Sequence, residues 1–239
     1  MNIIPLGDIH GRDMWKEILS KNIEWDKAIF IGDYFDAKED ITPQQQIDNF
    51  KEIIEFKRKL KDNVILLFGN HDYHYLKTSK EQYSGFQMWQ KTEISDLLHQ
   101  AIDQGLLQVC FAYKHFLFSH AGIIKTWCKD NDINIEDGSM EQSINDLLLH
   151  KPNSFRFTPG VTFNNYGDDV CQGPTWVRLN SLQKDGVENV IHVVGHTMQE
   201  NLNIMLNEDK KSGVIMIDTL GTTQEYLNII DEEVFINKL

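Results

Sequence analysis

The sequence contains six short apolar runs that end abruptly in polar clusters, and each run has the length of a β-strand. The runs are rich in Ile, Val, Leu and Phe, which pack well in sheets. The runs, each followed by its cluster and the residue numbers of that cluster, are NIIPL–GDIHG (7–11), AIFI–GDYFD (32–36), VILLF–GNHD (69–72), HFLF–SHAG (119–122), VIHVV–GHT (195–197) and VIMI–DTLG (218–221). Any one of these clusters could be an ordinary polar turn. Their repetition is what constrains the fold.

Amphipathic stretches with helical periodicity lie between several of these runs. We expect helices over residues 12–21, 42–60, 93–104 and 140–150, the second of them beginning with Thr42 as N-cap followed by a proline. Alternation of strand, polar turn and helix predicts an α/β sandwich with much of its sheet parallel. In such sheets the ligand crevice lies beyond the carboxyl ends of the strands. The six clusters are therefore expected to converge in space.

The converging side chains are of the types that bind metal ions. The strand-terminal candidates are Asp8, His10, Asp33, Asn70, His120 and His196, with Asp36, His71 and Asp72 close to them. Carboxylate, imidazole and amide ligands without thiolate suit Mn²⁺, Fe or Zn²⁺, and six groups are too many for one tetrahedral site. Two ions roughly 3.5–4 Å apart can clamp the oxygens of phosphoryl transfer and lower the pKa of a bound water. A single histidine of this kind is more often a core or capping residue, but that alternative does not account for the whole set.

The size, charge and cysteine content of the chain limit its expected domain number, binding partners and cellular compartment. With 239 residues, 41% of them apolar, the chain predicts one α/β domain over residues 1–239. The net charge of −13 argues against binding to a nucleic-acid duplex. Apolar runs of about five residues are too short to cross a membrane, and no signal peptide precedes the cluster at 7–11. Cys110, Cys128 and Cys171 form no CxxC pair, which favours a reducing, cytoplasmic setting.

The series GDIHG, GDxxD, GNHD, SHAG and GHT resembles the calcineurin-like metallophosphoesterase superfamily. Within it, the chain looks closest to the bacterial and phage serine/threonine phosphoprotein phosphatases and the related symmetrical diadenosine tetraphosphate hydrolases. The resemblance implies a four-layer α-β-β-α sandwich with mixed sheets and two divalent metal ions, for which we favour Mn²⁺, with Fe or Zn²⁺ as alternatives.

The resemblance also implies roles for individual residues. The six metal ligands by position are Asp8 and His10 for the first ion, Asp33 as the bridge, and Asn70, His120 and His196 for the second. His71 resembles the family's general acid, and Asp36 resembles the carboxylate that orients it. A carboxylate bonded to an imidazole fixes its tautomer, which independently supports this pairing.

The chain departs from the phosphoprotein phosphatases at a phosphate-binding arginine. The family motif GDxVDRG ends here as GDYFDAK, so Ala37 occupies the position of that Arg and Lys38 follows it. An ammonium group does not reproduce a bidentate guanidinium fork. Arg178, in TWVRLN, resembles a second phosphate-binding Arg of bacterial members, although an Arg placed for surface packing is the alternative. The second His of the superfamily's GHxH is replaced by Met198, which favours the phosphoprotein-phosphatase branch.

Segment 125–172 lies where the family builds its substrate-facing cover, and it matches no motif. It reads either as an insertion that determines specificity or as a surface elaboration with its own small core. Its notable residues are Phe155, Arg156, Phe157, Phe163, Tyr166, Asp168 and Asp169. Asp218 resembles a family residue that supports structure. The histidines without a motif, interpreted as structural or exposed, are His74, His99, His115, His150 and His192.

These observations predict a dimetal-dependent phosphoesterase that hydrolyses phosphate monoesters by attack of a metal-activated water. The expected substrates are phosphorylated proteins or small phosphate esters. The alternative is a hydrolase of dinucleoside polyphosphates or other nucleotides, and an aromatic slot for a nucleobase would distinguish it. A catalytically dead scaffold would have lost ligands, and none of the six is missing.

Overall fold

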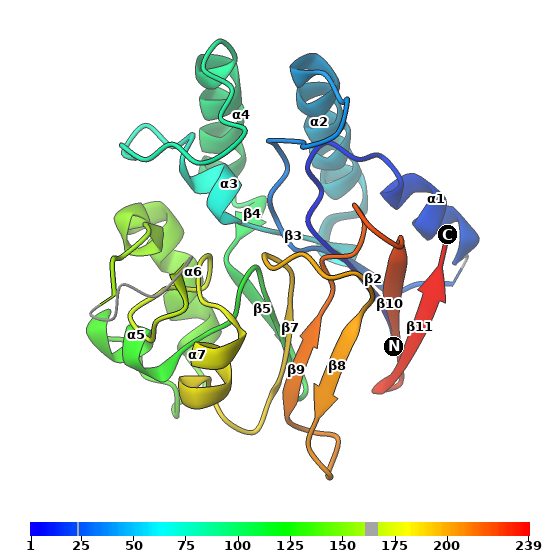
Figure 1. The fold of residues 1–239 in the computed structure, drawn as a ribbon, viewed down its shortest axis with the longest axis vertical. Helices are drawn as coiled ribbons and strands as arrows, with labels where there is room; N and C mark the ends of the chain where they lie inside the picture. Colours follow the sequence, from blue (N-terminus) through cyan, green and yellow to red (C-terminus); the bar gives the residue numbers. More distant parts are fainter. Residues whose placement is uncertain (23, 161–166) are drawn as a thin grey trace.

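Two mixed β-sheets form the frame of the computed structural model, which describes residues 1–22, 24–160 and 167–239 (Figure 1). The first sheet has the strand order β11-β10-β1-β2-β3-β4, and the second has the order β5-β6-β7-β9-β8. The strands of the first sheet are β1 (Asn2–Leu6), β2 (Lys27–Phe30), β3 (Val64–Leu67), β4 (Leu107–Gln108), β10 (Glu225–Ile230) and β11 (Glu233–Lys238). Those of the second are β5 (Cys110–Tyr113), β6 (Phe116–Ser119), β7 (Ile191–Val194), β8 (Asn203–Leu206) and β9 (Gly213–Met216).

Each sheet places three of the predicted strands side by side and parallel. They are β1, β2 and β3 in the first sheet and β6, β7 and β9 in the second. The register aligns their carboxyl ends, because Leu6 pairs with Phe30 and Phe30 with Leu66. Val194 likewise pairs with Met216. The six predicted strands are confirmed, and their polar clusters begin at a common edge of each sheet.

The six parallel strands are buried on both faces, which explains their nearly continuous apolar sequences. Ile3, Ile29, Phe116 and Ile215 belong to a core between the two sheets. Phe30, one residue after Ile29, faces the other way and belongs to the core beneath the helices. Figure 1 shows helices on the outer side of both sheets. The predicted four-layer α-β-β-α sandwich is therefore confirmed.

Four of the helices, α1, α2, α4 and α6, match the stretches predicted from the sequence, and α3, α5 and α7 were not predicted. Their bounds are α1 (Trp15–Lys21), α2 (Pro43–Leu60), α3 (Asn70–Tyr73), α4 (Lys91–Asp103), α5 (Lys125–Asp130), α6 (Met140–His150) and α7 (Leu179–Asp185). Thr42 caps α2 and forms a capping box with Gln45. The first helix begins at Trp15 and not at residue 12, because Arg12 still belongs to the turn that follows β1. Among the described residues, no helix is long and apolar enough to cross a membrane.

The described part of segment 125–172, residues 125–160 and 167–172, packs onto the rest of the molecule. It contains α5, α6 and a short 3₁₀ helix over Pro152–Phe155. Trp127 and Phe155 are buried in the same core as the helix-facing residues of the sheets, so the segment does not form a separate core. Phe163 and Tyr166 lie outside the described residues.

Candidate active site

Four residues that follow the parallel strands have left-handed backbone conformations. They are His10 (φ 42°), Asp33 (φ 52°), Asp36 (φ 65°) and His196 (φ 62°). Residues other than glycine rarely adopt this backbone region, because it costs about 1–3 kcal/mol per residue. Such residues are concentrated at functional sites. Here the conformation turns each side chain back over the end of its strand. The common edge of the sheets is therefore built at a cost to the backbone.

Glycines admit the carboxylates to this edge. A Cβ on Gly69 would overlap the Asp33 carboxylate, and a Cβ on Gly195 would overlap that of Asp8. Gly69 and Gly195, which open the GNHD and GHT clusters, are therefore required because a carboxylate lies against each of them, and not because of a turn. Both carboxylates are almost completely buried.

The six predicted ligand residues form one group, which we call the central cluster: Asp8, His10, Asp33, Asn70, His120 and His196. Within it, His120 Nε2 and His196 Nδ1 lie 2.9 and 3.0 Å from Asn70 Oδ1. His120 Nε2 is also 3.4 Å from Asp33 Oδ2, and His10 Nε2 is 3.8 Å from the same oxygen. Asp33, as the shared neighbour of both histidines, lies where a bridging carboxylate is expected.

Backbone carbonyls fix the tautomers of two of these histidines. His10 Nδ1 donates to Phe35 O at 2.5 Å, and His120 Nδ1 donates to Ile31 O at 3.0 Å. Each neutral ring then presents the lone pair of Nε2 toward the Asp33 carboxylate. Acceptors that face acceptors in a buried site are unfavourable unless a cation lies between them. This pattern, with the outer ring nitrogen held by a carbonyl, is typical of metal-binding histidine.

Burial disfavours every charge in the central cluster. It raises the pKa of Asp8 to about 6, although the backbone N–H of His196 donates to that carboxylate and offsets part of the effect. It raises the pKa of Asp33 well above its usual value, and the charge of Asp8 adds to the shift. Burial lowers the pKa of His10 and of His120 to about 3. Clustered buried carboxylates beside neutral imidazoles are what a divalent cation stabilises.

A second group of polar residues surrounds Asp36, and we call it the Asp36 cluster: Asp36, His71, His74, Tyr75 and Gln87. His71 Nδ1 lies 2.8 Å and His74 Nε2 lies 2.7 Å from Asp36 Oδ2. Tyr75 Oη donates to Asp36 Oδ1 at 2.5 Å. Burial alone would raise the pKa of Asp36, but hydrogen bonds from His71 and His74 lower it to about 2. Asp36 therefore stays ionised.

A backbone hydrogen bond connects the two clusters, because His71 N–H donates to Asp33 Oδ1 at 2.8 Å. Asp72, which follows His71, has a structural role instead. Its carboxylate accepts backbone N–H groups of Asp33, Tyr34 and Gly69 at 2.8–3.0 Å. It thereby fastens the loop after β2 to the loop after β3.

Residues 1–200 match the family model described as calcineurin-like phosphoesterase. The chain belongs to this family. The family implies a centre with two metal ions, and the donors of the central cluster fit it: two ring nitrogens direct lone pairs at the Asp33 carboxylate, and burial raises the pKa of both Asp8 and Asp33.

Solved structures with the same fold include several phosphatases. The cold-active protein-tyrosine phosphatase of a psychrophilic Shewanella species is 21% identical over 98% of this chain and 77% of its own, with a TM-score of 0.64. A protein serine/threonine phosphatase from Saccharomyces cerevisiae is 12% identical over 99% and 79%, with a TM-score of 0.57. A metallophosphoesterase from Sphaerobacter thermophilus is 14% identical over 100% and 88%, with a TM-score of 0.54. No curated protein matches the sequence.

In this calcineurin-like phosphoesterase, Arg178 lies close to the central cluster, and the charge of Lys38 reaches Asp218, which lies beside that cluster. Arg178 is the N-cap of α7, and its Nη1 donates to Thr197 Oγ1 at 2.9 Å, next to His196. Burial lowers the pKa of Arg178. Lys38 is exposed to solvent. Asp218 is buried beside Asp8, whose charge adds to the effect of burial in raising the pKa of Asp218.

Aromatic rings connect the two sides of the site. Trp176 lies 5.5 Å from His196, Tyr83 lies 4.7 Å from Trp176, and His71 lies 5.9 Å from Tyr83, all measured between ring centroids. Phe157 packs edge to face on Trp176 at 5.0 Å. None of these contacts was predicted, because Tyr83 and Trp176 belong to no strand-terminal cluster. Phe157 does come from the segment expected to face the substrate.

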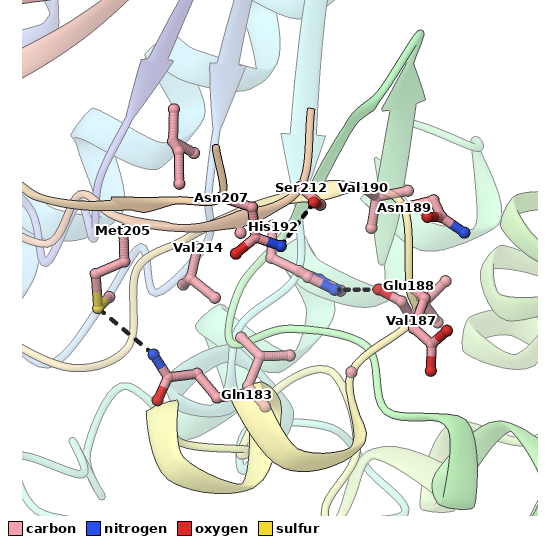
Figure 2. Close-up of a pocket in the computed structure, with 14 residues that line it drawn as sticks. Gln183, Val187, Glu188, Asn189, Val190, His192, Met205, Asn207, Ser212 and Val214 are labelled. Atoms are coloured by element: carbon pink, nitrogen blue, oxygen red, sulfur yellow. Dashed lines mark hydrogen bonds between the residues drawn. The ribbon is translucent and has the colours of Figure 1, made fainter. Parts of the chain in front are cut away.

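A groove of about 570 Å³ lies elsewhere in the phosphoesterase, between α7 and strands β7, β8 and β9 (Figure 2). His192 lies in it at the start of β7, whereas His196 follows the end of that strand. His192 Nε2 donates to Val187 O at 3.0 Å, and burial lowers the pKa of His192 to about 4. The groove is therefore separate from the candidate active site.

Proposed function

We propose that the chain is a dimetal-dependent phosphomonoesterase of the protein-phosphatase type. The observation that carries the proposal is that the central cluster and the Asp36 cluster lie side by side, joined by the hydrogen bond from His71 N–H to Asp33 Oδ1. In the proposed assignment, Asp8 and His10 hold the first ion, Asp33 bridges, and Asn70, His120 and His196 hold the second. We favour Mn²⁺ for both positions. When bound, two such ions supply charge neutralisation at the phosphoryl oxygens and a water of lowered pKa.

His71 is the proposed general acid. Its Nδ1 is held by Asp36 at 2.8 Å, which leaves Nε2 as the ring atom that can donate a proton to the leaving oxygen. Asp36 fixes the tautomer and the ring orientation, and its pKa of about 2 keeps it anionic in this role. Arg178 is the proposed phosphate-binding residue, since its guanidinium group lies beside Thr197 and is partly withdrawn from solvent.

Phosphorylated proteins and small phosphate esters are the proposed substrates. The alternative substrates, dinucleoside polyphosphates or other nucleotides, would need a slot between parallel ring faces. Among the described residues near the site, Phe157 and Trp176 instead meet at 71°, and Tyr83 and Trp176 meet at 81°, so these rings pack against one another. This packing favours a monoesterase.

Two broader features of the sequence analysis enter the proposal as well. We assign the whole of residues 1–239 to one domain, which the core shared by segment 125–172 and the sheets supports. We assign the protein to a reducing, cytoplasmic compartment, which its three free cysteines support.

A substrate panel tests the proposed function. Phosphopeptides containing Ser, Thr or Tyr, p-nitrophenyl phosphate, diadenosine tetraphosphate and cyclic nucleotides are supplied to the Mn²⁺-loaded protein, with Asp33→Asn as the control preparation. We expect the monoesters to have the highest kcat/KM and the control to be inactive on all of them. A higher kcat/KM for diadenosine tetraphosphate than for every monoester would favour the nucleotide hydrolase. Equal activity in the control would show that a contaminant is responsible.

A further inference from the structure

Polar groups contact Asp36 at both carboxylate oxygens, and only one of these contacts comes from His71. Its Oδ2 atom is shared by His71 Nδ1 at 2.8 Å and His74 Nε2 at 2.7 Å. Its Oδ1 atom is approached by Tyr75 Oη at 2.5 Å and Gln87 Nε2 at 3.4 Å. A carboxylate has about four acceptor positions, so this one is fully occupied by donors. His74 supplies one of the two contacts on the oxygen that holds His71.

The orientation of His74 is itself fixed. The side chain is fully buried, and its Nδ1 accepts the backbone N–H of Tyr83 at 3.0 Å. The ring proton of neutral His74 must then be on Nε2, which faces Asp36. The Tyr83 ring also stacks on His74, with centroids 4.9 Å apart and planes inclined by 16°. His74 is therefore a donor to Asp36, not a metal ligand, although three ligand-type side chains meet there.

The segment that holds His74 also closes over Asp36, and we call residues 81–87 the covering loop. Gly85 has φ +88°, and a Cβ there would lie 2.9 Å from Asp36 Cβ. Gln87 N–H donates to Tyr75 Oη at 2.7 Å, and Gln87 Nε2 donates to Gln46 Oε1 at 2.7 Å. The covering loop thus touches Asp36, His74 and Tyr75 from one side and fixes all three relative to α2.

We propose that His74 is a positioning residue for His71, acting through Asp36. Tyr75 and Gln87 contact Oδ1 of Asp36, and the contact of His74 Nε2 with Oδ2 keeps that second oxygen directed at His71 Nδ1. Without the donor, the terminal torsion of an aspartate has a broad range, and the imidazole loses its fixed partner. This inference rests on the proposed acid role of His71, whereas His74 itself touches neither substrate nor metal.

Two substitutions that differ by one methylene group test the proposal. The amide nitrogen of Gln occupies roughly the position of His Nε2, whereas that of Asn corresponds to Nδ1. His74→Gln therefore keeps the donor to Asp36, and His74→Asn removes it. The quantity measured is the leaving-group ratio: kcat/KM for a phosphoserine peptide divided by kcat/KM for p-nitrophenyl phosphate, with metal content determined on each sample.

The leaving-group ratio is expected to fall roughly 10-fold in His74→Asn, a part of the about 10²–10⁴-fold that acid catalysis contributes. It should stay within about twofold of wild type in His74→Gln. His192→Asn is the matched control, because His192 is also a buried histidine that donates through Nε2, to Val187 O at 3.0 Å. The His192→Asn protein should be less stable than wild type, but its leaving-group ratio should be unchanged.

His71→Asn separates this proposal from the proposed function. If His74 acts only through His71, adding His74→Asn to His71→Asn should lower the ratio no further, as a double-mutant cycle would show. A normal ratio in His74→Asn beside a low one in His71→Asn would overturn the positioning role and keep the acid role. A further drop in the double variant would show that His74 acts elsewhere. A normal ratio in His71→Asn would remove the acid role and this inference with it.

If His74→Asn does not fold, Gly85→Ala tests the same contact from the covering loop. The added Cβ at 2.9 Å from Asp36 Cβ, on a backbone at φ +88°, must displace Asp36 or the loop. We expect the leaving-group ratio to fall in that variant with both metals retained. An unchanged ratio would count against the positioning role of this region.

Discussion

The central cluster and the Asp36 cluster use the same kinds of side chain and have opposite electrostatics. In the central cluster, imidazole lone pairs face carboxylates, and burial raises the pKa of Asp8 to about 6. In the Asp36 cluster, N–H and O–H groups face the carboxylate, and they lower the pKa of Asp36 to about 2 against the effect of burial. Both carboxylates are 1% exposed, so the difference does not come from burial.

The direction of the donors decides what each cluster can do. His10 and His120 give their protons to backbone carbonyls and present lone pairs to the centre. His74 has the opposite arrangement, because a backbone N–H occupies its Nδ1 and leaves the proton on Nε2. The backbone atoms around the histidines thus decide whether a buried carboxylate faces ring lone pairs or ring N–H groups.

The largest expected effect comes from removing cations, which should affect the central cluster alone. Protein supplied with Mn²⁺ should contain about two ions per chain, chelation should abolish hydrolysis, and returning metal should restore it. Asp33→Asn should lower metal content and reduce kcat/KM for alkyl and p-nitrophenyl phosphates alike. Elemental analysis and kinetics on the same samples provide the measurement. Full activity in excess chelator, with metal shown to be absent, would eliminate the dimetal mechanism.

The next largest effect should come from the Asp36 cluster and should depend on the leaving group. His71→Asn keeps an amide near Asp36 but loses Nε2, so it should cost about 10²–10⁴-fold on alkyl phosphates. The loss on p-nitrophenyl phosphate should be clearly smaller, because that leaving group departs without a proton. Asp36→Asn should show the same bias more mildly. Equal losses on both substrates, with both metals retained, would contradict the acid role.

A residue outside both clusters should have an intermediate effect on substrate binding. Loss of the charge-assisted partner in Arg178→Ala should cost about 1.5–3 kcal/mol, or roughly 10- to 150-fold in kcat/KM, mainly through KM. Metal content should not change. Arg178→Lys is the matched control and should recover part of the loss, because it keeps the charge without the fork. A change below about twofold would place Arg178 outside the site and make Lys38 the next residue to test.

The smallest effect on activity is expected at His192, a buried histidine that belongs to neither cluster and should influence folding stability alone. Burial lowers its pKa to about 4, so the unfolded chain binds a proton below pH 6.5 that the folded chain rejects. Stability should therefore fall as the pH falls from about 6.5 to about 4, by roughly 3 kcal/mol from this group.

His192→Gln keeps a donor for Val187 O and cannot titrate, so the same acid loss should be smaller in this variant. Urea unfolding of both proteins in chelator, at several pH values, gives the comparison. Chelator is needed because His10 and His120 shift with the same sign and would also respond to metal. Identical pH dependence of the free energy of unfolding in the two proteins would show that folding does not lower the pKa of His192.

The sequence predicts the six parallel strands, the helices α1, α2, α4 and α6, and the convergence of the central cluster, whereas β4, β5, β8, β10, β11, α3, α5 and α7 are not predicted. Apolar runs specify buried strands through local side-chain chemistry, and parallel strands bring their carboxyl ends together whatever the loops contain. The contact between His71 and Asp36 was also anticipated. Prediction from the sequence stops at the backbone conformation after β2. No pattern indicated that Asp33 and Asp36 would adopt positive φ values.

The surroundings of Asp36 could not be predicted. His74 lacks a motif, and its role depends on a backbone N–H of Tyr83, which has no sequence signature. The same holds for Trp176, whose contacts with Tyr83 and His196 join residues far apart in the chain. Short-range patterns identify which side chains are suited to a site, but long-range packing decides which atoms face them.

The division of the central cluster between the two sheets determines when the site can be assembled during synthesis. Asn70 follows a strand of the first sheet, and it meets His120 and His196, which lie 50 and 126 positions further along and follow strands of the second. A nascent chain that has completed only β1, β2 and β3 of the first sheet lacks His120 and His196, so it holds an incomplete set of donors. Metal uptake should then come after the two sheets have docked. The ions should act as late cross-links between residues that are far apart in the chain.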